Sequence, residues 1–189
     1  MKKMLSNKKR LLYLLCIALF LVYLISANWI MTSVIDGEHA LNKFTQSIDE
    51  IPVYHEDDDD GIISYVANFI TDTQLMRIAF NGYAFLKGEA GEDNERSIKI
   101  LIIGEDGSTY YSNAMLYTRV SNIRHINEIG QTLPEGEFSF STNFSTLLLK
   151  DGVYQVYLYV QESPKLYGMK NTGITFEKKT GELVWLTED

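Results

Sequence analysis

Apolar and polar positions follow two different patterns along this chain of 189 residues. The first pattern is an uncharged apolar run, Leu11–Met31, directly behind a basic cluster that ends at Arg10. The second begins near Gly61, where short segments alternate apolar and polar residues and are rich in β-branched and aromatic side chains. A period of two is typical of β-strands with one buried face. We therefore expect an N-terminal helix followed by a β-rich domain.

The alternating part predicts seven or eight strands, separated by turn residues such as Asp106-Gly107 and Asp151-Gly152. Asp-Gly between alternating segments favours a hairpin, because both turn residues can take positive φ. The least strand-like stretch, Arg119–Leu133, is expected to be a crossover loop with a helical turn. The fold class is then mainly β, an antiparallel immunoglobulin-like β-sandwich. The expected strands are Ile62–Thr71, Leu75–Lys87, Ser97–Glu105, Thr109–Val120, Glu137–Leu147, Val153–Gln161, Lys170–Glu177 and Leu183–Leu186.

Alternation also predicts which side chains face the core. In the strand from Ser97 the inward set is Ile98, Ile100 and Ile102, which leaves Leu101 and Ile103 on the outer face, where a loop would cover them. Two sets are open for the strand from Val153: Val153, Gln155, Tyr157 and Tyr159, or Tyr154, Val156, Leu158 and Val160. The second set is more apolar, so we expect it to face inward.

Tyr157 and Tyr159 then lie on the solvent face of their strand and are our candidate binding residues. An exposed tyrosine offers a flat apolar ring with a polar tip, which can stack on a sugar or on a partner protein. The alternative for each is ordinary half-buried packing against neighbouring strands.

The run Leu11–Met31 is long enough to form a transmembrane helix, since about 20 apolar residues cross the hydrocarbon core. Five basic residues precede it, and basic flanks favour retention of residues 1–10 in the cytoplasm. We therefore expect a single-pass cell-membrane protein with an extracytoplasmic C-terminal domain, in which Leu11–Met31 contacts membrane lipid. A cleaved signal peptide is the alternative, but its apolar core is normally about 7–15 residues long.

Residues 32–60 are expected to be a stalk between the membrane helix and a β-sandwich over residues 61–189. Its front part, Ser33–Ile51, has apolar residues at near-helical spacing and ends at Pro52. The following sequence HEDDDDG is a charge run that should be extended and solvated.

The charge of the chain is unevenly distributed. The sequence holds 17 Lys and Arg and 25 Asp and Glu; five of the bases precede Thr32, which leaves 12 bases against 25 acids and a formal charge of −13. Because an acidic domain is repelled by polyanions, nucleic acid is not expected as a ligand.

The residues that usually carry catalysis or bind metals form no motif in this sequence. An EF-hand alignment of Glu56, Asp58 and Asp60 places the closing acidic position on Ala67, so the calcium template fails. The three histidines are far apart, and the sole cysteine, Cys16, lies inside the apolar run. No nucleophile elbow or phosphate-binding glycine loop occurs. We expect no metal, no cofactor and no enzymatic activity.

With the strands placed, several short sequences show a resemblance to a known family. Asn81–Gly88 (NGYAFLKG) resembles a strand of a β-sandwich accessory module found in Gram-positive surface-polysaccharide and teichoic-acid assembly proteins. Other segments are similar to later parts of that module, although Thr118–Val120 lacks the usual proline and aspartate. The resemblance covers about residues 75–177, and these segments are Ile98–Ile103 with Asp106-Gly107 and Tyr110-Tyr111, Glu137–Phe140 and Leu149–Val156. It implies an accessory or binding role at the cell surface.

These observations predict a membrane-anchored extracytoplasmic binding or accessory protein that acts in cell-envelope glycan assembly or in surface interaction. Its expected partner is a membrane protein or a cell-envelope glycan. The first alternative is a structural subunit of a larger membrane complex. The second is an enzyme that uses Asp or Glu as acid and base on a sugar, but the acidic residues gather in the stalk and in turns.

Overall fold

The computed structural model describes residues 16–17, 19–20, 22–23, 41–54, 61–72, 76–87 and 96–186. The chain divides into two compact units, residues 1–38 and 39–189. In the first unit the described residues are helical.

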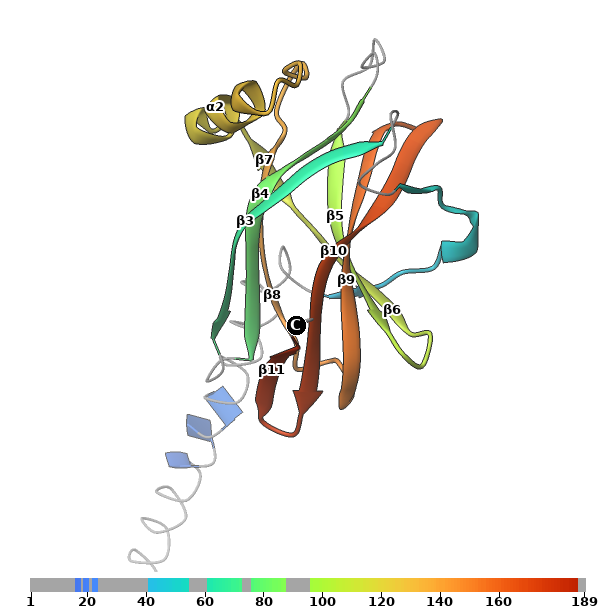
Figure 1. The fold of residues 1–189 in the computed structure, drawn as a ribbon. Coiled ribbons are helices and arrows are strands. Elements are labelled where there is room, and N and C mark those ends of the chain that lie inside the picture. The colour runs from blue at the N-terminus through green and yellow to red at the C-terminus, as the bar shows by residue number, and fades with distance from the viewer. Residues whose placement is uncertain are drawn as a thin grey trace, which may run out of the picture. The chain divides into compact units, whose positions relative to one another are not determined.

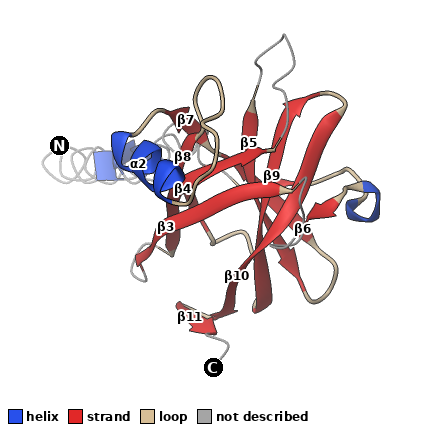
Figure 2. Ribbon diagram, turned by 45° about the horizontal axis from the view of Figure 1, so that its top comes forward, coloured by secondary structure: helices blue, strands red, loops and turns tan. Residues whose placement is uncertain are grey.

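The second unit is mainly β and contains two sheets, which Figure 1 and Figure 2 show as separate layers. Within the described residues one sheet has seven strands and the other has four. The seven-stranded sheet has the order β1 (Asn42–Lys43), β6 (Thr109–Asn113), β5 (Ser97–Gly104), β9 (Gly152–Ser163), β10 (Leu166–Lys179) and β11 (Glu182–Leu186), with β2 (Val53–Tyr54) paired to β10. The four-stranded sheet has the order β3 (Ile62–Asp72), β4 (Arg77–Leu86), β8 (Ser139–Ser145) and β7 (Met115–Tyr117).

The main core lies between the two sheets and confirms the predicted inward residues. It contains Ile98, Ile100 and Ile102 from β5 and the set Tyr154, Val156, Leu158 and Val160 from β9. Across from them lie Ile78, Phe80 and Ala84 of β4 and Phe140 and Phe144 of β8. Two sheets that share one apolar core are consistent with the predicted β-sandwich.

The number of strands differs from the predicted seven or eight for two reasons. The expected strand Thr109–Val120 is divided at Ala114, so that β6 belongs to one sheet and β7 to the other. Residues 41–54 add β1 and β2. Phe44, Ile48 and Ile51 of this segment pack on the outer face of the seven-stranded sheet, whereas Leu41 and Tyr54 pack with the main core. Over residues 41–51 the structure therefore differs from the predicted helical stalk: it has β1 and a 3₁₀ helix at Ile48–Glu50.

One α-helix, α2 (Val120–Glu128), lies in the second unit where a crossover with a helical turn was expected. It packs on the face of the four-stranded sheet that points away from the main core, as Figure 2 shows. The contact is apolar and joins Ile126 of the helix to Tyr83, Phe85 and Phe138.

The structure does not bear out the predicted transmembrane helix. Within the parts of the chain that the structure describes, no helix combines the length and the apolar character needed to cross a membrane. A span requires about 20 consecutive predominantly apolar residues in one helix. The transmembrane span predicted over Leu11–Met31, and the single-pass cell-membrane localisation that followed from it, are therefore wrong. The other residues of this range, the tail 1–10, residues 32–40 and the sequence HEDDDDG up to Asp60 lie outside the described residues.

Candidate functional site

The predicted binding residue Tyr159 lies in the outer face of the seven-stranded sheet, but it is covered. Residues 41–54, here called the covering segment, pack across this face, and Tyr159 is only 4% exposed. Its ring meets Phe44 of the covering segment edge-on, with centroids 6.1 Å apart. Burial raises the pKa of Tyr159, and neighbouring Tyr167 raises it further. Tyr159 is thus a packing residue between sheet and covering segment.

Tyr157 is half-buried on the same strand, and its hydroxyl donates a hydrogen bond to Oε1 of Gln155 at 3.1 Å. Leu101, which was expected on the outer face, is fully buried under the covering segment together with Ile51. The outer face of this sheet is therefore an apolar layer of its own rather than a solvent-exposed aromatic surface.

An open groove lies where the covering segment meets the turn between β5 and β6, and we call it the β5–β6 groove. Its volume is about 790 Å³, which falls within the roughly 300–1,000 Å³ typical of small-molecule sites. The lining comes from three segments of the chain: Lys43, Phe44, Gln46, Ser47, Ile48 and Asp49; Ile103 and Asp106–Tyr110; and Lys150. The two candidate tyrosines do not line it.

The β5–β6 turn forms one wall and is held by hydrogen bonds within itself. Gly107 has a φ of 77°, a conformation that glycine adopts readily. The backbone N–H of Ser108 donates to Oδ1 of Asp106 at 2.9 Å, and the N–H of Gly104 donates to the carbonyl of Ser108 at 2.8 Å. Hydrogen bonding to Ser108 holds the pKa of Asp106 below its usual value, with a smaller contribution from Lys150. Asp106 is therefore a carboxylate at neutral pH.

The covering segment forms the other wall and is anchored to β6 beside the turn. The N–H of Phe44 donates to the carbonyl of Thr109 at 2.9 Å, and the Phe44 ring packs edge-on against Tyr111. The chain then turns through the 3₁₀ helix, where the N–H of Ile51 donates to the carbonyl of Ile48 at 2.9 Å. Because Phe44 and Ile51 point into the sheet, the intervening polar residues Gln46 and Asp49 are left exposed.

The groove offers several kinds of polar group at close quarters. Gln46 has an amide that both donates and accepts hydrogen bonds, and Ser47 and Ser108 have hydroxyls that do the same. Charges of both signs are present, from Lys43 and Lys150 and from the two carboxylates. Apolar surface is contributed by Phe44, Ile48, Ile103 and the ring of Tyr110.

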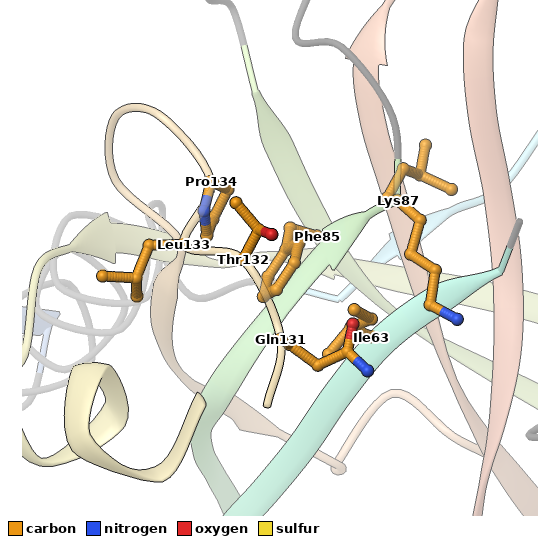
Figure 3. A pocket seen from close by; sticks show the side chains of 8 residues that line it. Ile63, Phe85, Lys87, Gln131, Thr132, Leu133 and Pro134 are labelled. Carbon is orange, nitrogen blue, oxygen red and sulfur yellow. The ribbon is translucent and has the colours of Figure 1, made fainter. Parts of the chain in front are cut away.

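A second cavity lies beside the four-stranded sheet, under the loop that follows α2. Figure 3 shows Gln131, Thr132 and Pro134 of this loop beside Phe85 of β4 and Ile63 of β3. Its volume is about 190 Å³, below the range typical of small-molecule sites, roughly 300–1,000 Å³. Its floor is also part of the core under α2, because Phe85 packs edge-on against Phe138. The larger groove is therefore the better candidate site.

Comparison with known protein families, with curated proteins and with solved structures finds no match to this chain. The groove must be interpreted from its own chemistry. Across the described ranges, no group of three His, Cys, Asp or Glu side chains is placed to hold a metal ion. His125 instead lies where α2 meets the four-stranded sheet, and its Nδ1 is 3.1 Å from the hydroxyl of Tyr83.

The residues of the groove were missed in the sequence because they were assigned to a stalk. The spacing of Phe44, Ile48 and Ile51 is close to that of an amphipathic helix, yet the same spacing serves a short strand followed by a 3₁₀ turn. The turn at Asp106-Gly107 was found, but only as a hairpin signal. What placed these two segments together is packing between Phe44 and Tyr111, which are far apart in the sequence.

Proposed function

We propose that this protein is a non-catalytic binding module whose β5–β6 groove takes a hydroxyl-rich glycan of the cell envelope. The observation that carries the proposal is the convergence of amide, hydroxyl and carboxylate groups from two segments on one open groove with apolar patches. Sugar hydroxyls donate and accept hydrogen bonds together, and groups of these kinds satisfy both roles. The apolar C–H face of a sugar ring fits against side chains such as Phe44 and Tyr110.

The charge of the groove favours a neutral glycan over a polyanionic one. Two lysines and two aspartates line it, so the groove has no strong sign of its own. The whole chain carries a formal charge of −8, which repels polyanions at longer range. A neutral sugar is not repelled by the net negative charge of the chain, and it needs no net charge in the groove.

The hydrogen-bonded turn supports binding rather than acid–base chemistry. A general acid at neutral pH needs a raised pKa, whereas the pKa of Asp106 is lowered by its bonds to Ser108. The proposal also agrees with the family resemblance, since Asp106-Gly107 and Tyr110 belong to the segments that carry it.

The test uses the full chain and an array of bacterial envelope oligosaccharides that contains both neutral and phosphate-bearing structures. We expect binding to neutral members, and each bound glycan should be recovered unchanged when analysed by mass spectrometry. Replacing Gln46 by Ala should weaken binding about fivefold, because one lost hydrogen bond is worth about 1 kcal/mol.

Gln131→Ala is the matched control, because it makes the same change in the smaller cavity. It should leave glycan binding unchanged. An array with no bound glycan, or a loss of binding with Gln131→Ala but not with Gln46→Ala, would contradict the proposal.

A further inference from the structure

We propose that Lys178, a buried lysine of β10, is a positioning residue for the β5–β6 groove, because it holds the chain between β8 and β9 so that Lys150 lies in the groove beside Asp106. Residues 146–151 connect the two strands and are here called the β8–β9 loop. The inference rests on the proposed function, since it concerns how the proposed binding groove keeps its shape and charge.

The first argument is that Lys178 is buried without a counter-charge. The residue is only 7% exposed, and lysine is almost never buried unless it is paired. In the described part of the chain no carboxylate forms an ion pair with Lys178. Burial lowers the pKa of Lys178, and the more distant charge of Asp151 partly opposes this change. Removing an ammonium group from water is costly, so its hydrogen bonds must offset that cost.

The second argument is where those hydrogen bonds go. Nζ of Lys178 donates to the carbonyl of Leu147 at 3.3 Å and to the carbonyl of Leu149. Hydrogen bonds from a charged donor are roughly twice as strong as those between neutral groups. Both carbonyls belong to the β8–β9 loop, and the second one directly precedes Lys150 in the chain. Lys178 therefore fixes the backbone that leads into Lys150.

The ends of the β8–β9 loop are fastened by other groups. At its start, the N–H and the hydroxyl of Thr146 both donate to the carbonyl of Met76 at 2.8 Å. At its end, the buried hydroxyl of Tyr154 donates to the carbonyl of Lys150 at 2.9 Å. Lys178 holds the middle of the loop between these two anchors. The loop is thus held along its length, in the arrangement that makes Lys150 a lining residue of the groove.

The third argument is what Lys150 does in the groove. It is the lining residue that the β8–β9 loop contributes. Its charge helps to hold the pKa of Asp106 below the usual value, after the larger effect of the bonds from Ser108. Lys150 thus offsets the charge of Asp106, and its ammonium can donate to sugar hydroxyls. A loop that moved away would remove that donor and leave the carboxylate uncompensated.

The first experiment titrates the Asp106 carboxylate by carbon-13 NMR in the full chain without any ligand. Lys150→Ala should raise the pKa of Asp106, because it removes a positive charge beside the carboxylate. Lys178→Met, which puts an unbranched apolar side chain in place of the ammonium, should raise it as well. The double variant should raise it no further than Lys150→Ala does, because Lys178 acts through Lys150. Lys179→Met is the matched control: the neighbouring lysine side chain is 59% exposed, and its loss should leave the pKa of Asp106 unchanged.

The second experiment does not depend on the folding of Lys178→Met. In the unchanged chain, nitrogen-15 relaxation should give the backbone N–H of Lys150 an order parameter of about 0.85, the value of a rigid backbone. A value below about 0.6, typical of a flexible segment, would show that the loop is not held and would overturn the proposal.

The third experiment measures binding of the neutral oligosaccharide that the array test retains. Lys150→Ala should weaken binding about tenfold, because a hydrogen bond from a charged donor is lost. Lys178→Met should weaken it by up to the same factor, and the double variant no more than Lys150→Ala. If the array retains no oligosaccharide, the proposed function fails, while the Asp106 titration still decides the role of Lys178.

Three results of the titration would overturn the proposal. The first is a pKa of Asp106 that Lys178→Met leaves unchanged. The second is full addition of the effects of Lys178→Met and Lys150→Ala, since Lys178 would then act independently of Lys150. The third is an equal change with Lys179→Met, which would mean that the loss of any nearby lysine has the same effect.

Discussion

Arg96 donates from Nε to both carboxylate oxygens of Glu162, at 2.8 Å each, and the two side chains are only 7% and 5% exposed. The same guanidinium donates from Nη1 to the carbonyls of Glu135 and Glu137. Glu162 in turn accepts a hydrogen bond from the N–H of Leu86 at 3.2 Å. Since Leu86 belongs to β4 and Glu162 to β9, this buried pair links the two sheets.

Replacing Glu162 by Gln should destabilise the fold by about 3–5 kcal/mol, because it leaves a buried guanidinium without its counter-charge. The free energy of unfolding in urea measures the effect. Lys179→Ala is the control, since Lys179 pairs with Glu177 at 2.8 Å but is 59% exposed. That variant should change stability little. Equal losses of unfolding free energy in the two variants would mean that the buried Arg96–Glu162 pair stabilises the fold no more than the exposed pair does.

Asn122 fastens α2 to the sheet beneath it. Its Nδ2 donates to the carbonyl of Gly82 at 3.0 Å and to Oγ of Ser139 at 2.9 Å, and the residue is buried. Asn122→Ala should cost about 1–3 kcal/mol, because buried polar groups are left without partners. Asn127→Ala, an exposed change on the same helix, should be nearly neutral in urea denaturation. If the two variants have the same stability, the Asn122 bonds contribute nothing net.

The raised pKa of Tyr83 predicts that the folded protein loses stability at alkaline pH. Burial, and to a smaller extent Tyr65, raises the pKa of Tyr83 above 10.0. The unfolded chain therefore loses this proton first, so the stability from this group is complete below pH 10 and is lost as pH rises through the folded pKa. Tyr83→Phe removes both this effect and the hydrogen bond to His125.

The variant should be less stable by about 1 kcal/mol near neutral pH, because one hydrogen bond is lost. Above pH 10 the wild-type curve should fall more steeply, so that the two curves approach each other. Urea unfolding at a series of pH values between 8 and 11 measures both curves. A gap that stays constant over this range would show that Tyr83 titrates alike in the folded and unfolded chains.

Gly168 lets the covering segment approach the sheet. A methyl group at this position would lie 2.1 Å from Cε2 of Tyr54 and 3.2 Å from the carbonyl oxygen of Pro52. Gly168→Ala should therefore displace β2 and cost about 1–3 kcal/mol. Hydrogen exchange of the Met169 amide, which donates to the Pro52 carbonyl at 2.8 Å, should become faster.

Because the covering segment also forms a wall of the β5–β6 groove, Gly168→Ala should weaken glycan binding as well. The double variant Gly168→Ala/Tyr54→Ala removes the ring that the methyl group strikes and should recover slow exchange at Met169. Fast exchange in the double variant would place the strain elsewhere.

The strands and the inward residues could be predicted from the sequence because they depend on local alternation. The expected Ser97–Glu105 became β5, and Val153–Gln161 became β9 with its more apolar set inside. The division of Thr109–Val120 could not be predicted locally. A contact across the molecule accompanies this division: Oγ of Ser112 lies 2.9 Å from Oγ1 of Thr142 on the facing sheet.

The candidate site was harder to predict than the strands. Tyr159 was expected on a solvent-exposed face of β9 and is instead buried, because the sequence pattern does not show that residues 41–54 cover that face. The predicted transmembrane span shows a related limit: hydropathy over Leu11–Met31 measures composition, and among the described residues no helix is long and apolar enough to cross a membrane.

By itself the sequence determined the β-rich class, the turn positions and the side of each central strand that is buried, since a period of two and Asp-Gly turns act over a few residues. Only the tertiary structure decided that the covering segment closes over Leu101 and Tyr159 and meets the β5–β6 turn. The physical reason is that the hydrophobic effect is non-directional. Any apolar surface can bury Phe44, and the tertiary fold decides which surface Phe44 contacts.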